Sequence, residues 1–274
     1  MSAPPPDPSS ALDQLRQKFK TPRATGRESD YPPIRNFILD LMAEGRRKNI
    51  VHVFLQADIT DMLARLSAVD RDRSTVTSVV AATLAQAIGE NRVFNSYRLG
   101  KSRLVAFDDV DLSFTIEREV DGTLLPVPYI VRAANLKSVE QIQQELRAAK
   151  VAPIGAAGPM SALEKSFFLM PNFVRRIVWS YLRRDPYRFK LLAGTVGVTS
   201  IGMFASGALV GQPITPMTLT LCIGSTEKKV VMVNGFPVER AFLHLNFSVD
   251  HDIIDGGPLI RFVEGFGKRL GEVG

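Results

Sequence analysis

Hydrophobic residues along the chain recur with two periods, and segments of the two kinds are intermixed. A spacing of three to four residues predicts helices, whereas alternation or a short continuous apolar run predicts strands. Helices are predicted at 34–45, 58–69, 75–91, 135–150 and 256–273, and strands at 49–60, 102–107, 110–117, 123–131, 195–202, 217–225, 229–235 and 240–251. This mixture favours an α/β or α+β sandwich with a large mixed sheet.

The first thirty residues differ from the rest of the chain. They begin MSAPPPDPSS and are rich in Pro, Ser and charge, which predicts a flexible N-terminal arm over residues 1–30, followed by one domain over residues 31–274. The start has neither the basic nor the apolar stretch of a secretory signal, and no run of about 18 apolar residues predicts a membrane span. A lone cysteine, Cys222, forms no internal disulfide and is expected in the core. We therefore expect a cytoplasmic protein.

The net charge of +6 comes from one segment. Residues 165–190 contain seven basic residues and one acid, so the remainder of the chain is close to neutral. A charge confined in this way argues against nucleic-acid binding. Pro171 and Pro186 divide the segment into one or two predicted helices.

Wound as a helix, residues 172–184 are amphipathic. The apolar side chains that share one face are Phe173, Val174, Ile177, Val178 and Tyr181. Packing of this face on the protein's own domain or on a neighbouring copy is the favoured interpretation. Docking on an acidic partner protein and peripheral contact with an anionic membrane are the alternatives.

The candidate catalytic residues lie between a predicted strand and a predicted helix, in SVDHDIIDGGP at 248–258. His251 and Asp255 stand there in an H-x-x-x-D-G arrangement. A neutral imidazole takes a proton from a thiol or hydroxyl near neutral pH, and the carboxylate across a tight turn anchors the local structure. By spacing alone, a surface histidine beside scattered acids is an equal alternative. The other two histidines, His52 and His244, lie in predicted strands and are interpreted as structural.

Four sequence blocks follow one another in a fixed order. They are RNFILDLM with NIVHVFLQADIT, the stretch 110–142, GVTSIGMF followed by PITPMTLTLCIG, and FSVDHDIIDGGPLIRFVEGF. Together they resemble the catalytic domain of the 2-oxoacid dehydrogenase (dihydrolipoamide) acyltransferases and, more distantly, chloramphenicol acetyltransferase. The resemblance covers residues 31–274 and implies a chloramphenicol-acetyltransferase-like two-layer sandwich with a large mixed sheet.

The resemblance implies a role for each matching residue. His251 matches the general base, which deprotonates the attacking thiol of coenzyme A or dihydrolipoamide. Thr199 matches the hydroxyl that hydrogen-bonds the oxyanion of the tetrahedral intermediate, with the adjacent Ser200 as the alternative donor. In this family the active sites lie between the subunits of a trimer, so a homotrimer is implied as well.

The remaining matches concern the loop that carries the base. Asp255 and Arg35 match a pair that holds this loop without transferring a proton. Gly256 and Gly257 match the positions where the helix start lies close to the substrate channel.

The implied function is acyl transfer between a coenzyme A thioester and a thiol, amine or hydroxyl acceptor, with no metal and no redox cofactor. About thirty residues before the domain leave no space for a lipoyl domain, so we expect no lipoyl group on this chain and, where a carrier is used, a separate acyl-carrying protein. Asp252 replaces the usual Arg after the base, and TPMT replaces N-P-P-Q at 215–218, which leaves the acceptor open. A non-catalytic trimeric scaffold of a larger assembly is the alternative function. Condensation chemistry ranks lower, because Asp250 stands where that class carries a second His.

Overall fold

The computed structural model of the protein describes residues 35–68, 74–120, 123–151, 170–202 and 207–272, together with a few single positions before residue 32. The chain divides into two units, residues 1–32 and 33–274. The arm predicted at 1–30 lies largely outside the described residues. The sheet and its flanking helices all belong to the second unit.

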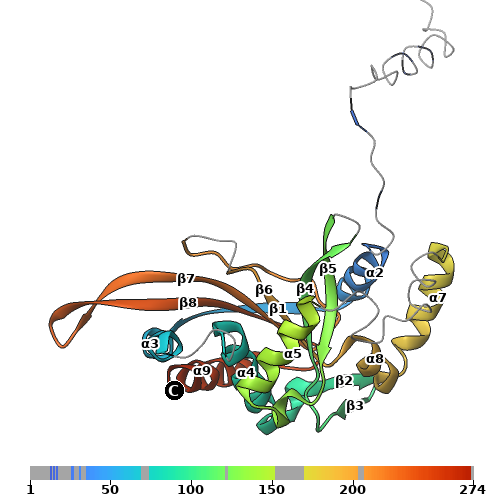
Figure 1. Cartoon of the computed structure of the whole chain (residues 1–274). Coiled ribbons are helices and arrows are strands. Elements are labelled where there is room, and N and C mark those ends of the chain that lie inside the picture. Colours follow the sequence, from blue (N-terminus) through green and yellow to red (C-terminus); the bar gives the residue numbers. More distant parts are fainter. Residues whose placement is uncertain are drawn as a thin grey trace, which may run out of the picture. The chain divides into compact units, whose positions relative to one another are not determined.

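Six strands form one mixed sheet in the order β1-β8-β7-β6-β4-β5 (Figure 1). β6 runs parallel to both β4 and β7, and the remaining pairs are antiparallel. The strands are β1 (Ile50–Asp58), β4 (Leu112–Val120), β5 (Thr123–Val131), β6 (Val196–Ser200), β7 (Leu219–Val233) and β8 (Phe236–Asp250). The large mixed sheet expected from the sequence is therefore confirmed.

The strands predicted at 217–225 and 229–235 form a single long strand, β7, paired with β8. Its register with β8 shifts between Ile223 and Thr226, and Gly224 lies at the shift. A Cβ at Gly224 would come within 2.3 Å of the carbonyl oxygen of Leu209. The close passage of residues 207–211 over the strand therefore requires glycine at this position.

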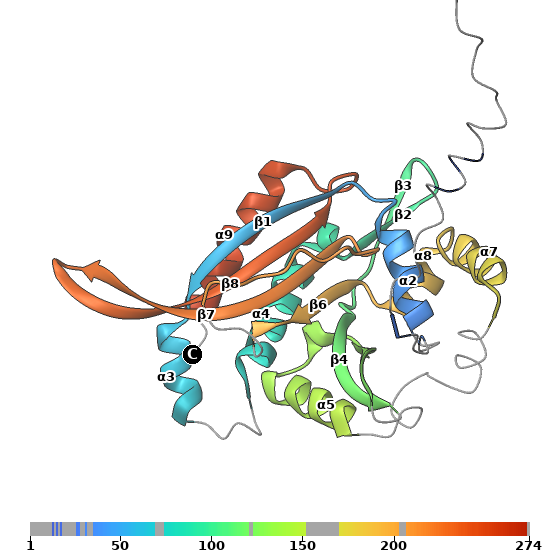
Figure 2. The ribbon, with the colours of Figure 1, turned by 90° about the horizontal axis from the view of Figure 1, so that it is seen from above.

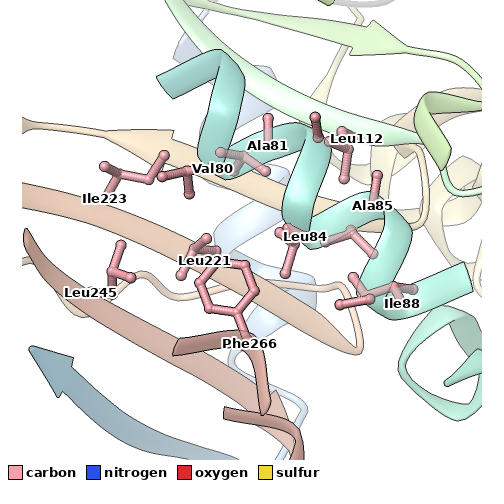
Figure 3. Packing of buried hydrophobic residues seen from close by; sticks show 14 of the residues in the cluster. Val80, Ala81, Leu84, Ala85, Ile88, Leu112, Leu221, Ile223, Leu245 and Phe266 are labelled. Atoms are coloured by element: carbon pink, nitrogen blue, oxygen red, sulfur yellow. The ribbon is translucent and has the colours of Figure 1, made fainter. Parts of the chain in front are cut away.

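One face of the sheet is covered by α3 (Thr60–Ala68), α4 (Val76–Glu90), α5 (Val139–Val151) and α9 (Gly256–Glu272), which lie below the long strands in Figure 1. Figure 3 shows Leu84 and Ile88 of α4 packed towards the sheet, beside Leu221, Leu245 and Phe266, all of them buried. Burial of each such side chain stabilises the fold by about 1.5–3 kcal/mol. This layer is the main hydrophobic core.

Local capping agrees with the sequence at two of these helices. Thr75 caps α4 through a reciprocal capping box with Ser78. Ser138 and Gln141 form a second box before α5, in which the Gln141 side chain accepts from the Ser138 N–H at 2.9 Å and the Ser138 hydroxyl accepts from the Gln141 N–H at 3.3 Å. Each box satisfies backbone donors that the first helical turn leaves without a partner.

A smaller cluster is formed by α2 (Arg35–Gly45), α7 (Asn172–Leu182), α8 (Pro186–Ala193) and the hairpin of β2 (Ser96–Leu99) and β3 (Arg103–Ala106). Its buried residues include Tyr97, Phe107, Trp179 and Phe189. α2 and α7 lie next to each other, as Figure 2 shows. The described part of the basic segment, from residue 170 on, contains two helices: α7 begins directly after Pro171, and α8 begins at Pro186.

The face that α7 buries differs from the expected one. Arg175 and Trp179 are buried, whereas Phe173, Ile177 and Tyr181 are exposed. The prediction that these three side chains pack on the protein's own domain is therefore wrong for the single chain. The physical reason is a buried ion pair, in which the Nε atom of Arg175 lies 2.9 Å from Oδ2 of Asp40 on α2 and holds the helix in this orientation.

Candidate active site

The loop between β8 and α9 carries the candidate base. β8 ends at Asp250 and α9 begins at Gly256, so His251 lies in the intervening turn, where its side chain is exposed. The backbone N–H of His251 donates to the carbonyl oxygen of Asn49 at 2.8 Å. This bond joins the loop to the residue just before β1.

Two acidic neighbours of His251 fix this loop, which we call the base loop (residues 250–255). Lys48 Nζ lies 2.7 Å from Oδ2 of Asp250, whose side chain is only 3% exposed. Asn49 Nδ2 donates to Oδ1 of Asp252 at 2.9 Å, and Arg98 approaches the other oxygen at 3.4 Å. A buried carboxylate needs such a cation, because desolvation of an unpaired charge is costly. The ion pair of Lys48 with Asp250 therefore joins the start of the base loop, at the end of β8, to the residues that precede β1.

Sequence reasoning missed the role of Lys48 and Asp250, although a signal was present. Asp250 continues the strand FLHLNFSVD, in which both faces are buried. A buried acid at the end of such a strand requires a basic partner, and Lys48 lies two residues before the strand that pairs with it.

The pair expected to hold the loop, Arg35 with Asp255, does not form in the single chain. Both residues are exposed, and no ion pair joins them within the part of the chain that the structure describes. Asp255 instead precedes α9, where its carbonyl oxygen accepts from the Leu259 N–H at 3.2 Å. Their catalytic roles stay predictions.

The candidate oxyanion donor lies far from the base loop of the same chain. Thr199 of β6 is in register with Cys222 of β7, and Cys222 with Asn246 of β8. Asn246 precedes His251 by five residues. With a strand rise of about 3.4 Å and a strand spacing of about 4.8 Å, Thr199 and His251 are separated by roughly 20 Å. One chain therefore does not bring the base and the donor together.

Thr199 belongs to the sheet face opposite α4. Its neighbour Val198 is part of the main core, and successive residues of a strand point to opposite faces. Thr199 and Ser200 are both partly exposed at the end of β6. The Thr199 hydroxyl is therefore on a face where a substrate or a second chain has access.

The two glycines that open α9 have free space around them in the single chain. A Cβ at Gly256 would meet no atom within 4 Å, and one at Gly257 would meet only Nη1 of Arg261 at 3.5 Å. Their expected proximity to a substrate channel stays a prediction.

The remaining histidines and the cysteine have structural surroundings. His52 Nδ1 lies 2.9 Å from the Ser248 hydroxyl, and His244 Nε2 lies 3.2 Å from Oε2 of Glu227. Burial raises the pKa of the Cys222 thiol, which keeps it protonated and unreactive at neutral pH. No cluster suited to binding a metal occurs among the described His, Cys, Asp and Glu residues.

A pocket of about 170 Å³ lies beside the base loop, between α2, β2 and the junction of α7 with α8. Tyr97 and Phe189 supply aromatic surface, and Arg98, Arg183 and Asp252 supply charge. Burial raises the pKa of Tyr97, so its hydroxyl stays neutral and donates to the Gly194 carbonyl oxygen at 2.9 Å. The hydrogen bond of Tyr97 thus fixes the aromatic wall of the pocket, and the charged side chains lie around it.

The base loop yields a stability prediction that separates Asp250 from Asp255. Asp250→Ala is expected to lower the free energy of unfolding by about 3 kcal/mol, because Lys48 loses its counter-charge in a largely buried place. Asp255→Ala is expected to change it by less than about 1 kcal/mol, since Asp255 is exposed. Urea unfolding of the two variants measures both values. A larger loss for Asp255→Ala would show that Asp255 anchors the loop.

Comparison with known proteins agrees with the sequence resemblance. Residues 189–273 match the family described as 2-oxoacid dehydrogenases acyltransferase (catalytic domain). The acetyltransferase component of the Mycoplasma genitalium pyruvate dehydrogenase complex is 24% identical over 193 residues, which are 69% of this chain and 41% of that protein. The chain thus spans less than half the length of this relative. A yeast (Saccharomyces cerevisiae) dihydrolipoyllysine-residue succinyltransferase is 32% identical over 76 residues, 27% of this chain and 16% of the relative.

Solved structures share the fold over nearly the whole chain. A probable dihydrolipoamide acetyltransferase from Listeria monocytogenes superposes with a TM-score of 0.67 at 19% identity, covering 90% of this chain and 95% of the other. The dihydrolipoamide acetyltransferase of Azotobacter vinelandii gives a TM-score of 0.63 at 18% identity, covering 99% and 98%. In that enzyme a serine, a histidine and an asparagine have been investigated for their role in the catalytic mechanism. The expected fold is confirmed.

Proposed function

Because residues 189–273 match this acyltransferase family and the chain has the fold of its catalytic cores, we propose that the protein is an acyltransferase. It moves an acyl group between a coenzyme A thioester and a thiol, amine or hydroxyl acceptor. His251 is the general base and Thr199 is the oxyanion donor.

The observation that carries this proposal is that the candidate residues have the same sequence spacing as three residues of a related enzyme. The investigated histidine of the Azotobacter vinelandii enzyme follows the serine by 52 residues and precedes the asparagine by 4. Thr199, His251 and Asp255 have the same two spacings, and each is chemically close to its counterpart. Threonine keeps the hydroxyl of serine, and aspartate has the shape of asparagine.

The chemistry needs only these side chains and the two substrates. The imidazole of His251 removes the proton from the acceptor thiol, and the sulfur attacks the carbonyl carbon of the thioester. The oxygen of the tetrahedral intermediate becomes negative and accepts a hydrogen bond from the Thr199 hydroxyl. The intermediate then expels the coenzyme A thiolate, which takes the proton from His251, so that the base returns to its neutral form. A preorganised hydrogen-bond donor at the oxyanion usually makes the largest contribution to the rate, because it stabilises the negative charge that develops in the transition state.

The separation of about 20 Å between Thr199 and His251 within one chain supports a site shared between subunits. In the proposed homotrimer, His251 of one subunit acts with Thr199 of its neighbour. The distal part of the β7–β8 hairpin, which extends beyond the helices in Figure 1, offers apolar surface for such a contact. Val230, Met232 and Phe236 are all exposed there, whereas a stable oligomer would cover side chains of this kind.

The loop contacts support a positioning role for Lys48 and Asp250. The buried ion pair fixes the end of β8, and the bond from the His251 N–H to Asn49 fixes the base itself. A base held in this way needs no reorganisation when the acceptor binds. These residues act on His251 and touch no reacting atom.

Mass spectrometry of the purified full chain tests the proposed function. The protein is incubated with a panel of acyl-CoA thioesters and with thiol, amine and hydroxyl acceptors, dihydrolipoamide among the thiols. We expect an acylated acceptor together with an equal amount of free coenzyme A for at least one pair. Absence of transfer for every pair, with the protein folded and oligomeric, would contradict an acyltransferase and favour the scaffold.

A further inference from the structure

Helices α7 and α8 expose large apolar side chains at regular helical spacing. Phe173, Ile177 and Tyr181 of α7 are 67%, 66% and 52% exposed, and each lies four positions after the one before it. Tyr187 and Leu191 of α8 repeat the same spacing and are also exposed. Soluble proteins rarely expose such contiguous apolar surface unless it binds something. We call these five side chains the α7–α8 surface.

The outward orientation of this surface is built into the fold. On the opposite side of α7, Trp179 is buried and Arg175 pairs with Asp40 on α2 at 2.9 Å. One turn beyond, Arg183 Nη1 lies 2.8 and 2.9 Å from the two carboxylate oxygens of Glu44. Rotation of α7 to bury Ile177 would break both ion pairs and leave Asp40 buried without its cation. Removing one partner of a buried pair is costly, so the apolar side chains stay on the outside.

Cations flank the α7–α8 surface. Arg176 and Arg184 are exposed, and neither has an acidic partner among the described residues. Arg188 lies over the Tyr181 ring, 4.7 Å from its centroid. The other basic residues between 172 and 190 form ion pairs with acids of this chain, so Arg176 and Arg184 carry the uncompensated positive charge; those paired residues are Arg175, Arg183, Arg188 and Lys190. An occupant of this surface therefore has to supply both apolar contact and negative charge.

We propose that the α7–α8 surface attaches the protein peripherally to an anionic lipid bilayer. Exposed aromatic and aliphatic side chains at helical spacing, with arginines beside them, are the composition of helices that lie in the bilayer interface. Tyrosine favours the headgroup level, where its ring and hydroxyl meet different surroundings. None of the helices that the structure describes is long and apolar enough to cross a membrane, which fits a contact confined to the interface.

Charge argues against a second copy of this chain as the occupant. A symmetric contact would bring the arginines of two α7–α8 surfaces together. An anionic bilayer supplies many charges at once and imposes no pairing geometry on the arginines.

Co-sedimentation with vesicles tests the charge requirement. Full-length protein is mixed with vesicles of phosphatidylcholine alone or of phosphatidylcholine with phosphatidylglycerol, at low and high salt. We expect binding only to the anionic vesicles, weakened by salt because the attraction decays over about 8 Å at physiological ionic strength. Arg176→Glu with Arg184→Glu is expected to weaken it by about tenfold or more. Arg65→Glu with Arg103→Glu, two exposed arginines elsewhere, changes the net charge equally and is expected to leave binding intact.

A second pair of variants tests the apolar contact. Phe173→Ser with Ile177→Ser is expected to reduce binding to the anionic vesicles at least tenfold. Leu136→Ser, a control at a residue that is 74% exposed, is expected to leave it unchanged. Light scattering is expected to give the same molar mass for all variants. Wild-type protein that stays in the supernatant with anionic vesicles, or binding that survives both α7 double variants, would overturn the proposal. A drop in molar mass for Phe173→Ser with Ile177→Ser would overturn it too, because a second copy then covers the surface. These outcomes do not depend on the acyl-transfer assay.

Discussion

Replacement of His251 by alanine is expected to reduce the rate of acyl transfer by about 10²–10⁴-fold, the usual contribution of a positioned acid–base group. Without the imidazole, the acceptor thiol keeps its proton at neutral pH, and the thiol is a much weaker nucleophile than the thiolate. The fold is expected to stay intact, because the side chain of His251 is exposed and its anchor to Asn49 uses the backbone N–H.

Steady-state kinetics with the best acyl-CoA and acceptor pair measure this effect, and thermal unfolding of the same preparation is the control for folding. His52→Ala is the matched variant, because His52 lies within β1 beside Ser248 and has no place in the mechanism. A His251→Ala protein that turns over at the wild-type rate would remove the proposed base.

Thr199→Ala is expected to reduce kcat by about 10²–10³-fold, corresponding to the 2.7–4 kcal/mol that loss of one oxyanion donor costs. The KM for the acyl-CoA is expected to change much less, since the hydrogen bond strengthens only when the oxygen becomes negative. Thr199→Ser is expected to retain most of the activity, because the hydroxyl is kept.

Ser200→Ala is the control for this prediction. Ser200 follows Thr199 on β6, and its side chain points to the other face of the sheet, so its loss is expected to leave kcat nearly unchanged. A large loss in Ser200→Ala together with an active Thr199→Ala would assign the donor to Ser200 instead.

The elements of the fold were largely predictable, because they depend on local patterns. Alternation in FLHLNFSVD marks β8, the helical spacing of apolar residues over 75–91 marks α4, and the prolines at 171 and 186 mark the starts of α7 and α8. The break at residues 226–228 was misread. These polar residues predict the end of one strand, whereas β7 continues through them as one side of an exposed hairpin.

The orientation of α7 was not predictable from helical periodicity. A buried arginine is unusual, so the pattern favours burial of Phe173 and Ile177. The partner that makes burial of Arg175 possible is Asp40, which is 135 residues away in the sequence. No local pattern contains that pairing. For the ion pair of Lys48 with Asp250, the acid at the end of a buried strand indicates that a basic partner is needed, but not that Lys48, 202 residues away in the sequence, supplies it.

The sequence predicts a set of candidate site residues, which stays a prediction, but it does not predict their arrangement. The motifs single out Thr199 and His251, and the register of β6, β7 and β8 then separates them within one chain. Because Thr199 and His251 lie far apart within one chain, the roles that the resemblance implies for them constrain the assembly. If both residues act in one reaction, two chains have to contribute to each site.

Activity of mixed oligomers formed from His251→Ala and Thr199→Ala chains tests this central claim most directly. The two inactive variants are co-expressed with different affinity tags, and oligomers that carry both tags are isolated and assayed. A shared site predicts recovery of activity, up to about a third of the wild-type value, because every trimer that contains both variants has both wild-type groups at one of its three interfaces. Mixed oligomers as inactive as the separate variants would contradict a site built from His251 of one subunit and Thr199 of the next.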